Sequence, residues 1–403
     1  MTASPAIPLQ STHYAVAAPG LPPFTAAELR QLGLLHRRSK EHKRAVEAGG
    51  VTFLGDRAAL YRANLHLRTA SRVLVRLGEF RAENFQQVRA RATTLGWAQF
   101  LAPGQPIDLR VTCHKSRLYH SGAVAERVAA AIEERLGQAP ALHKGDEESD
   151  DQPPQLVVVR LDHDLCTVSV DSSGALLHRR GYRLATAKAP LRETLAAALI
   201  MAAGWPAGDA LPPPLLDPFC GSGTIPIEAA LMALHLAPGR QRRFAFMAWP
   251  GFDAGQWQRL LDEADAQAAA RRAELGGRLA IFGSDRDAGA VVAAQANAGR
   301  AGVGDAIAFA CHALSAIDPP AGPGFVATNP PYGQRVRGGP DLRNLYAQLG
   351  NVLRQHCPGW QATILSSDRH LLAQTGLGLD TGATVVNGGI SVTAGRGRVP
   401  GDS

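Results

Sequence analysis

Thr328-Asn329-Pro330-Pro331-Tyr332-Gly333 directly follows the apolar run 324–327. Each proline lacks a backbone N–H and fixes φ, so a strand formed by the apolar run has to end there, with Asn329 at its tip. In open α/β sheets, ligands bind at this edge. The Asn oxygen and a carbonyl freed by the prolines can accept both hydrogens of an amine, while the Tyr ring stacks on a base. The stretch therefore favours a site for an amino-bearing nucleobase. The structural alternative is a proline-rich turn with a core tyrosine.

Short apolar strands alternate with helices from about residue 188 onward, which predicts a parallel α/β sheet. We expect strands at 215–217, 279–283, 306–311, 325–328, 362–366 and within 384–399, and helices at 190–204, 224–236, 288–301 and 341–357.

A second motif, Asp217-Pro218-Phe219-Cys220-Gly221-Ser222-Gly223-Thr224, lies between the first of these strands and its helix. Its glycines let the backbone approach a ligand closely and leave amide hydrogens at a helix N-terminus. The loop lacks the Gly-Lys pair of a phosphate cradle and the third glycine of a dinucleotide fingerprint. Asp285 stands at the tip of the second strand, where a carboxylate can hold two ribose hydroxyls. A lone glycine turn is more often structural, but the turn, Asp285 and Asn329 after successive strands together indicate a nucleoside site.

The formal net charge of +7 is unevenly distributed. Residues 1–140 carry 19 Lys and Arg against 10 Asp and Glu, whereas the remainder carries 23 against 25. A basic excess confined to the N-terminal third fits a region that binds a polyanion, although a solvated basic face is equally common.

Two basic stretches are candidate contacts for such a polyanion. Arg68, Arg72 and Arg76 recur every fourth residue. On a continued helix they form one stripe, and on a strand that begins after residue 71, Arg72 and Arg76 still share a face. Lys115 and Arg117 lie in a segment, 114–120, that mixes cations with an aromatic ring. Residues 240–257 also interleave arginines with rings; we expect those rings to pack as a structural insertion and the arginines to contact RNA.

The N-terminal region predicts an α+β unit. We expect strands at 13–18, 50–54, 107–113, 156–161, 165–170 and 176–180, and helices at 25–34, from 58, at 85–95 and at 122–136.

Composition narrows the class of protein. The chain of 403 residues is long enough for two or three domains, and no apolar run approaches the roughly 18 residues of a membrane span. The first ten residues lack the basic and apolar segments of an export signal. The five cysteines contain no Cys-x-x-Cys pair, which argues against disulfides and a thiolate zinc site. We expect a soluble, cytoplasmic, monomeric protein that needs no metal.

The motifs resemble those of a known class of enzyme. Residues 217–224 and 329–332 resemble motifs I and IV of class I S-adenosylmethionine-dependent amino-methyltransferases. More narrowly, residues 67–80, 178–183 and 189–193 are similar to bacterial RNA guanine-N2 methyltransferases that carry an N-terminal THUMP domain. The resemblance covers nearly the whole chain. It implies a ferredoxin-like segment at 1–60, an RNA-binding THUMP domain at 61–184 and a Rossmann-like catalytic domain at 185–403.

The resemblance also assigns roles to individual residues. It implies that S-adenosylmethionine is the cofactor and that structured RNA, either 23S ribosomal or transfer RNA, is the substrate. The implied residues are, for catalysis, Asn329, Pro330 and Tyr332, and for the cofactor, Asp217, Phe219, Gly221, Gly223, Thr224, Asp285 and His312. For RNA, Arg180 and Arg183 of the similar stretch 178–183 join the candidates Arg68, Arg72, Lys115 and Arg117 that spacing and charge indicate.

Two features depart from the family pattern. After the third strand the family usually has an acidic residue near the adenine, but here Cys311-His312-Ala313 follows, so His312 takes that place and the adenine contact is open. The chain also ends soon after the last strands, so we expect it to lack the second methyltransferase that some relatives carry. The nearest rival function is a DNA adenine-N6 methyltransferase, because Asn-Pro-Pro-Tyr serves that chemistry too. A catalytically silent RNA-binding protein is the rival from another class.

Overall fold

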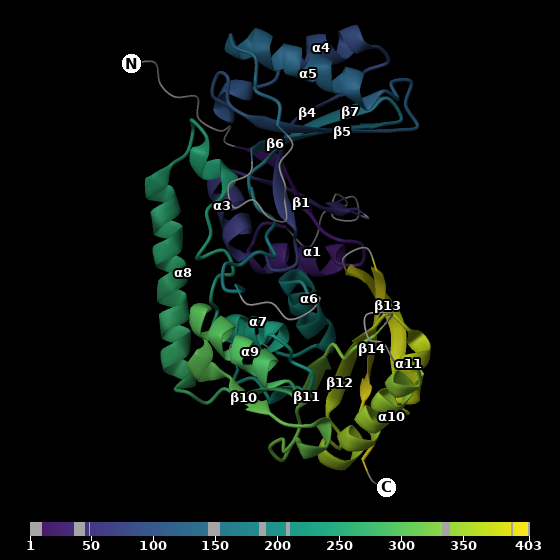
Figure 1. The fold of residues 1–403 in the computed structure, drawn as a ribbon. Helices are drawn as coiled ribbons and strands as arrows, with labels where there is room; N and C mark the ends of the chain where they lie inside the picture. The colour runs from purple at the N-terminus through teal and green to yellow at the C-terminus, as the bar shows by residue number, and fades with distance from the viewer. Residues whose placement is uncertain are drawn as a thin grey trace. The chain divides into compact units, whose positions relative to one another are not determined.

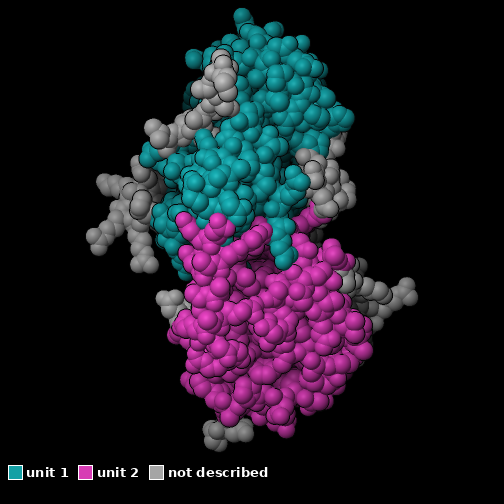
Figure 2. Space-filling view, turned by 90° about the vertical axis from the view of Figure 1, so that its left-hand side faces the viewer, with its two compact units in different colours: residues 1–17, 25–177, 241–261 teal, residues 18–24, 178–240, 262–403 magenta. Residues whose placement is uncertain are grey.

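The computed structural model describes residues 10–35, 45–47, 49–143, 154–184, 191–206, 210–332, 339–387 and 390–401. Gly333, the last residue of the stretch that begins at Thr328, lies outside them. The chain forms two compact units (Figure 2). Unit 1 comprises residues 1–17, 25–177 and 241–261, and unit 2 comprises residues 18–24, 178–240 and 262–403.

Unit 1 is built on a seven-stranded sheet in the order β2-β3-β1-β4-β7-β6-β5, antiparallel except for the pair β5 and β6. Its strands are β1 (Ser11–Val16), β2 (Val46–Glu47), β3 (Gly50–Gly55), β4 (Arg72–Arg81), β5 (Ile107–His114), β6 (Gln155–Asp162) and β7 (Leu165–Asp171). Its helices include α3 (Arg57–His66), α4 (Phe85–Thr93) and α5 (Ser121–Leu136), with short 3-10 turns at Trp97–Gln99 and Ala245–Ala248. Helices α4 and α5 lie side by side over one face of the sheet (Figure 1).

Two predictions for unit 1 need correction. Residues 176–180 do not form a strand. Their hydrogen bonds go elsewhere, because the Arg242 guanidinium donates to the Ala175 and Leu176 carbonyls and the Leu177 N–H donates to the Ser71 carbonyl. The helical stripe of arginines does not form either. Helix α3 ends at His66 and β4 begins at Arg72, so the strand alternative is the correct one.

Four of the five aromatic residues of 240–257 are buried, as expected, Phe252 being half-buried, and they pack within unit 1. Phe246 stacks on Tyr61 with ring centroids 4.4 Å apart, and Trp249 meets Phe100 edge-on at 4.8 Å. The Trp249 indole N–H also donates to Gln155 Oε1 at 2.7 Å. The segment therefore contributes a core layer to the N-terminal unit.

Unit 2 contains the predicted α/β sheet, in the order β10-β9-β8-β11-β12-β14-β13. The strands are β8 (Leu215–Asp217), β9 (Ile281–Asp285), β10 (Ala308–Cys311), β11 (Phe325–Thr328), β12 (Gln361–Ser366), β13 (Asp380–Asn387) and β14 (Ile390–Arg398). The helices are α6 (Glu193–Ala203), α7 (Thr224–Ala233), α9 (Ala288–Arg300), α10 (Gly339–His356) and α11 (Arg369–Gln374), with 3-10 turns at Gly304–Ala306 and Leu314–Ala316. Two helices cross the division between the units in sequence: α1 (Pro22–Gln31) and α8 (Ala254–Leu275), the second of which the sequence pattern did not predict.

Strand order places the site. Five strands, β8 to β12, run parallel, and β14 and β13 complete the sheet antiparallel. Strand β8 has β9, the next strand of this sheet in the sequence, on one side and β11 on the other, so the strand order reverses at β8. Such a reversal opens a crevice at the carboxyl ends of the two strands, where ligands bind in this architecture. Asp217 and Thr328 occupy those two ends.

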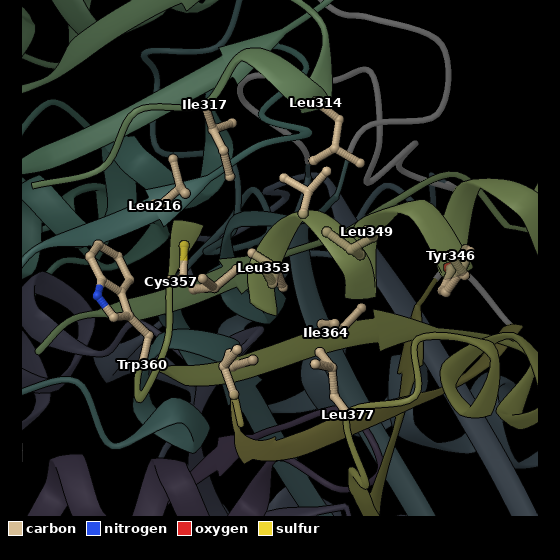
Figure 3. Close-up of a cluster of buried hydrophobic side chains, with 14 of the residues drawn as sticks. Leu216, Leu314, Ile317, Tyr346, Leu349, Leu353, Cys357, Trp360, Ile364 and Leu377 are labelled. Carbon is tan, nitrogen blue, oxygen red and sulfur yellow. The ribbon is translucent and has the colours of Figure 1, made fainter. Parts of the chain in front are cut away.

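The core of unit 2 beneath this edge is apolar. Alternate residues of the strands, such as Leu216 and Ile364, face a stripe of α10 formed by Tyr346, Leu349 and Leu353 (Figure 3). This is the buried face that helical spacing predicts for 341–357. The packing fixes β8, β11 and β12 side by side, and so fixes the loops at their ends.

Candidate active site

One buried hydrogen bond joins the two motifs of the sequence. Thr328 Oγ1 donates to Asp217 Oδ1 at 2.6 Å, and the Phe219 N–H donates to the same oxygen at 3.2 Å. Burial raises the pKa of Asp217 to about 7; these two hydrogen bonds oppose the rise, and the Asp285 carboxylate adds to it. The carboxyl group is therefore poised to lose a proton when a cation approaches.

The glycine turn has the geometry that close approach of a ligand requires. Gly221 has φ +52° and Gly223 has φ +85°, both in the left-handed region that favours glycine. A Cβ on Gly223 would lie 2.9 Å from the Ala294 Cβ, so this glycine is needed for packing. A Cβ on Gly221 would meet no described atom within 4 Å. Gly221 therefore borders open space, and Thr224 begins α7 directly after the turn.

Asp285 anchors the turn to the neighbouring strand. Its Oδ2 accepts from the Gly221 N–H at 3.0 Å, and its Oδ1 accepts from the Asp287 N–H at 3.0 Å. The half-buried His312 follows β10, and its N–H donates to the Asp285 carbonyl at 3.1 Å. The structure thus brings together the turn, the acidic strand tip and the histidine at one edge of the sheet, as the sequence predicts.

Asn329 carries an unused acceptor. Its Oδ1 is buried, and no hydrogen-bond donor reaches it among the residues that the structure describes. A buried acceptor without a donor costs about 1–3 kcal/mol, so such atoms commonly mark a ligand position. Pro330 is buried beside it, whereas Tyr332 is half-buried and packs against the apolar core, as Phe219 also does.

The six arginines and lysines expected to contact RNA divide into three groups. Arg72 and Arg180 are buried, and the side chain of Arg183 is 12% exposed; the three form ion pairs with Asp171, Glu228 and Glu193 respectively. Their guanidinium groups are withdrawn from solvent, because each neutralises a buried carboxylate, and they are not retained in the RNA-contact set. Lys115 and Arg117 are exposed on a loop of unit 1, where Arg117 pairs with Glu83. Arg68 is half-buried beside Glu28, whose carboxylate accepts its N–H.

Thr328 stands in the stretch 328–333, but its residue type and position alone predict no specific role for it. The structure assigns it the link to Asp217. The sequence did contain a general signal for this role: a threonine at the end of a buried strand has a buried hydroxyl, and a buried hydroxyl needs a hydrogen-bond partner.

Comparison with known proteins identifies the family. Residues 180–394 match the RMKL-like methyltransferase domain, and residues 12–74 match the RlmL ferredoxin-like domain. The chain belongs to the RMKL-like methyltransferase family.

Named relatives extend over the whole chain. A protein of Synechocystis called "Putative RNA methyltransferase" is 36% identical over 94% of this chain and 95% of its own length. The ribosomal RNA large subunit methyltransferase K/L of Syntrophotalea carbinolica is 37% identical over 90% of this chain. This chain spans about half the length of that K/L protein, of which 50% is matched.

Solved structures share the fold at similar coverage. A crystal structure of a "putative methyltransferase" in complex with S-adenosylhomocysteine (SAH) is 29% identical, with a TM-score of 0.82 over 98% of this chain and 99% of that one. A structure from Listeria monocytogenes, called a "predicted N6-adenine-specific DNA methylase", is 31% identical, with a TM-score of 0.80 over 96% of each chain.

The protein is an S-adenosylmethionine-dependent methyltransferase, and its residues fit that cofactor. Open space beside Gly221 leaves room for a ligand against the backbone, and Asp285 is held rigidly next to it. Asn329, whose side-chain oxygen has no described hydrogen-bond donor, directly follows Thr328, which is hydrogen-bonded to Asp217.

None of the described helices combines the length and the apolar character needed to cross a membrane.

Proposed function

We propose that this methyltransferase transfers a methyl group to the exocyclic N2 amine of a guanosine in structured RNA, either large-subunit ribosomal or transfer RNA. The observation that carries the proposal is the buried, unused Asn329 Oδ1 at the end of β11. An exocyclic amine supplies the donor that this oxygen lacks. The names of the Synechocystis and Syntrophotalea relatives support RNA as the substrate.

In the proposed reaction, Asn329 Oδ1 and the Pro330 carbonyl accept the two amine hydrogens, and the Tyr332 ring stacks on the base. The guanine amine is a poor base because its lone pair is delocalised, so fixing its orientation is the main task of the site. The cofactor, when bound, supplies an electrophilic methyl group on a sulfonium. Residues 217–224 and Asp285 would hold the cofactor that supplies this methyl group, and Asn329 with Pro330 would hold the amine nitrogen that accepts the group and releases one proton to water.

The cofactor contacts are proposed on the same geometry. The methionine-derived part is held by the turn that runs from Asp217 through Phe219 to Thr224, with Gly221 and Gly223 giving access to the backbone. Asp285 accepts from the ribose hydroxyls, and His312 lies at the adenine. Both carboxylate oxygens of Asp285 already accept backbone N–H groups, which fixes their direction before the ligand binds.

RNA binding is proposed for the N-terminal region, with a ferredoxin-like segment at 1–60, a THUMP domain at 61–184 and the catalytic domain from 185. The exposed loop with Lys115 and Arg117 is the strongest candidate contact among the predicted residues. The 84% exposed Tyr119 on the same loop offers a ring for stacking on an unpaired base. Arg68 is a weaker candidate because Glu28 lies beside it.

The test is a methyl-transfer assay with labelled S-adenosylmethionine and three acceptors: ribosomal RNA, transfer RNA and duplex DNA. Nucleosides from the digested acceptor are identified by mass spectrometry. The expected product is N2-methylguanosine in RNA. N6-methyladenine in DNA would instead establish the rival that the Listeria relative's name suggests. Absence of transfer to every acceptor would leave the silent RNA-binding protein.

Asn329→Ala separates chemistry from cofactor binding in this assay. Turnover should fall by about a hundredfold or more, because one positioned polar group is lost, while SAH affinity stays within about twofold. Asn351→Ala, which removes an exposed asparagine of α10, is the matched control and should leave both unchanged. Equal losses of turnover and affinity in Asn329→Ala would show that Asn329 is structural.

A further inference from the structure

A cluster of metal-ligating side chains lies in unit 1, in a part of the chain that the methyl-transfer site does not use. His114 ends β5, Asp162 ends β6 directly opposite it in register, and His163 is the next residue. The Nδ1 atoms of His114 and His163 lie 2.9 Å and 2.8 Å from the same oxygen, Asp162 Oδ1. One ligand atom from each residue falls within 4.8 Å of the other two.

The turn that holds His163 is conformationally unusual. Residues His163 and Asp164 connect β6 to β7 with φ +51° and +62°, as a two-residue hairpin loop requires. Glycine adopts such backbone angles at the lowest cost, and histidine is among the other residues that are enriched there. The turn therefore accommodates His163 and fixes the backbone that carries its imidazole.

Hydrogen bonds between two loops hold the cluster in place. The His163 N–H donates to the His114 carbonyl at 3.2 Å, and the Arg117 N–H donates to Asp164 Oδ1 at 2.7 Å. Ser116 Oγ accepts from the Asp164 N–H at 3.0 Å. The three ligands are thus arranged by the backbones of β5, β6 and the turn, before any ion binds.

The ligand set identifies the class of ion. Two imidazoles and one carboxylate suit zinc and neighbouring divalent transition metals, whereas calcium and magnesium prefer oxygen ligands. In a tetrahedral zinc site with bonds of about 2.1 Å, ligand atoms lie about 3.4 Å apart. The two histidine-to-Asp162 separations would need to open by only about half an ångström, and one nitrogen of each imidazole already lies within 4.8 Å of the other. The Arg160 guanidinium contacts the second Asp162 oxygen at 3.1 Å, which leaves Oδ1 directed at the histidines.

We propose that His114, Asp162 and His163 form a binding site for a divalent transition-metal ion of the zinc type, with a water molecule in the fourth position. The imidazole side chains are 61% and 67% exposed, so an ion can enter from solvent and keep a bound water. An ion there crosslinks the loop after β5 to the β6–β7 turn. The site lies apart from the residues proposed for methyl transfer, beside the loop of Lys115 and Arg117 that is proposed to contact RNA.

The test is isothermal titration of the full-length, metal-free protein with zinc ion alone. One zinc per chain is expected, with thermal stabilisation that a chelator reverses and that magnesium does not reproduce. His163→Asn keeps a residue that tolerates the left-handed turn, and His114→Gln removes the second imidazole; each should weaken zinc binding by more than tenfold. His143→Asn, which changes another exposed histidine of unit 1, is the matched control and should bind as the parent does.

Two results would overturn the proposal. One is the absence of zinc binding to the parent chain at about 100 μM. The other is unchanged zinc binding in both His163→Asn and His114→Gln, with circular dichroism showing that each variant is folded. Loss of binding in Cys311→Ser together with retention in the histidine variants would move the ion to the exposed thiol, and would equally refute the assignment.

Discussion

The proton on Asp217 provides a quantitative test of the cofactor site. Burial raises the pKa of this carboxyl group to about 7, with the Asp285 carboxylate adding to the rise. SAH carries an ammonium group on its methionine-derived part, which the proposed site assigns to the turn beginning at Asp217. A cation at that position stabilises the carboxylate, so ligand binding should release the proton.

The sign and size follow from this linkage. Above pH 7 the carboxylate is already ionised, and affinity is at its maximum. As the pH falls through 7, removing the proton opposes binding, and the dissociation constant rises toward tenfold per pH unit. Between about pH 7.5 and 5.5, a pKa of about 7 gives a loss of about 25-fold, or about 1.9 kcal/mol.

Isothermal titration of SAH across this range measures the effect, and repeating it in buffers of different ionisation enthalpy counts the released protons. Asp217→Asn should bind more weakly at pH 7.5 and show a flat profile, because no proton remains to be lost. Affinity of the parent protein that stays constant from pH 7.5 to 5.5 would refute the reasoning. A profile that persists in Asp217→Asn would assign the proton to another group.

Folding of the ligand-free protein should respond to the same group. An acid whose pKa is raised by folding contributes most to stability below its unfolded pKa of about 3.8, and that contribution is lost as the pH rises through about 7. The parent should therefore lose stability relative to Asp217→Asn over this window, by up to about 4 kcal/mol. Chemical denaturation at pH 4 and pH 8 measures the difference, and a constant difference would contradict the raised pKa.

Three further predictions concern the site and the RNA contact. Gly221→Val should abolish SAH binding as measured by calorimetry. Gly302→Val is the control: Gly302 has φ +73° and open space at the opposite edge of the sheet, so valine there causes a similar backbone strain and should leave SAH binding intact. Equal losses of SAH binding in the two variants would show that backbone strain alone causes the loss. Thr328→Val should lower the free energy of unfolding at pH 8 by about 1–3 kcal/mol, because Asp217 loses a buried donor, and urea denaturation that detects no change would exclude that bond. Charge reversal at Lys115 and Arg117 should weaken RNA binding and reduce the slope of log affinity against log salt by about 1–2, and unaltered slopes in filter binding would remove this loop from the RNA contact.

The sequence by itself determined most of the elements in unit 2 and the order in which they carry polar side chains. Short apolar runs followed by Asp217, Asp285 and Asn329 have the chemistry of buried parallel strands with ligand-bearing tips. The stripe of α10 was likewise readable from its spacing, because burial of that face follows from local periodicity. In each case the information is local, and tertiary contacts reinforce it.

Only the tertiary structure decided which charged groups face solvent. The sequence shows that Arg72, Arg180 and Arg183 are cationic, but their carboxylate partners lie 99, 48 and 10 residues away, and their withdrawal from solvent follows from those pairings. The same holds for Thr328 and Asp217, which are 111 residues apart and meet because β8 and β11 are neighbours. The sequence identifies the polar side chains that could bind or react with a ligand. The distances between strands in the folded protein decide which of them are paired, which are buried, and which have no hydrogen-bond partner among the described residues.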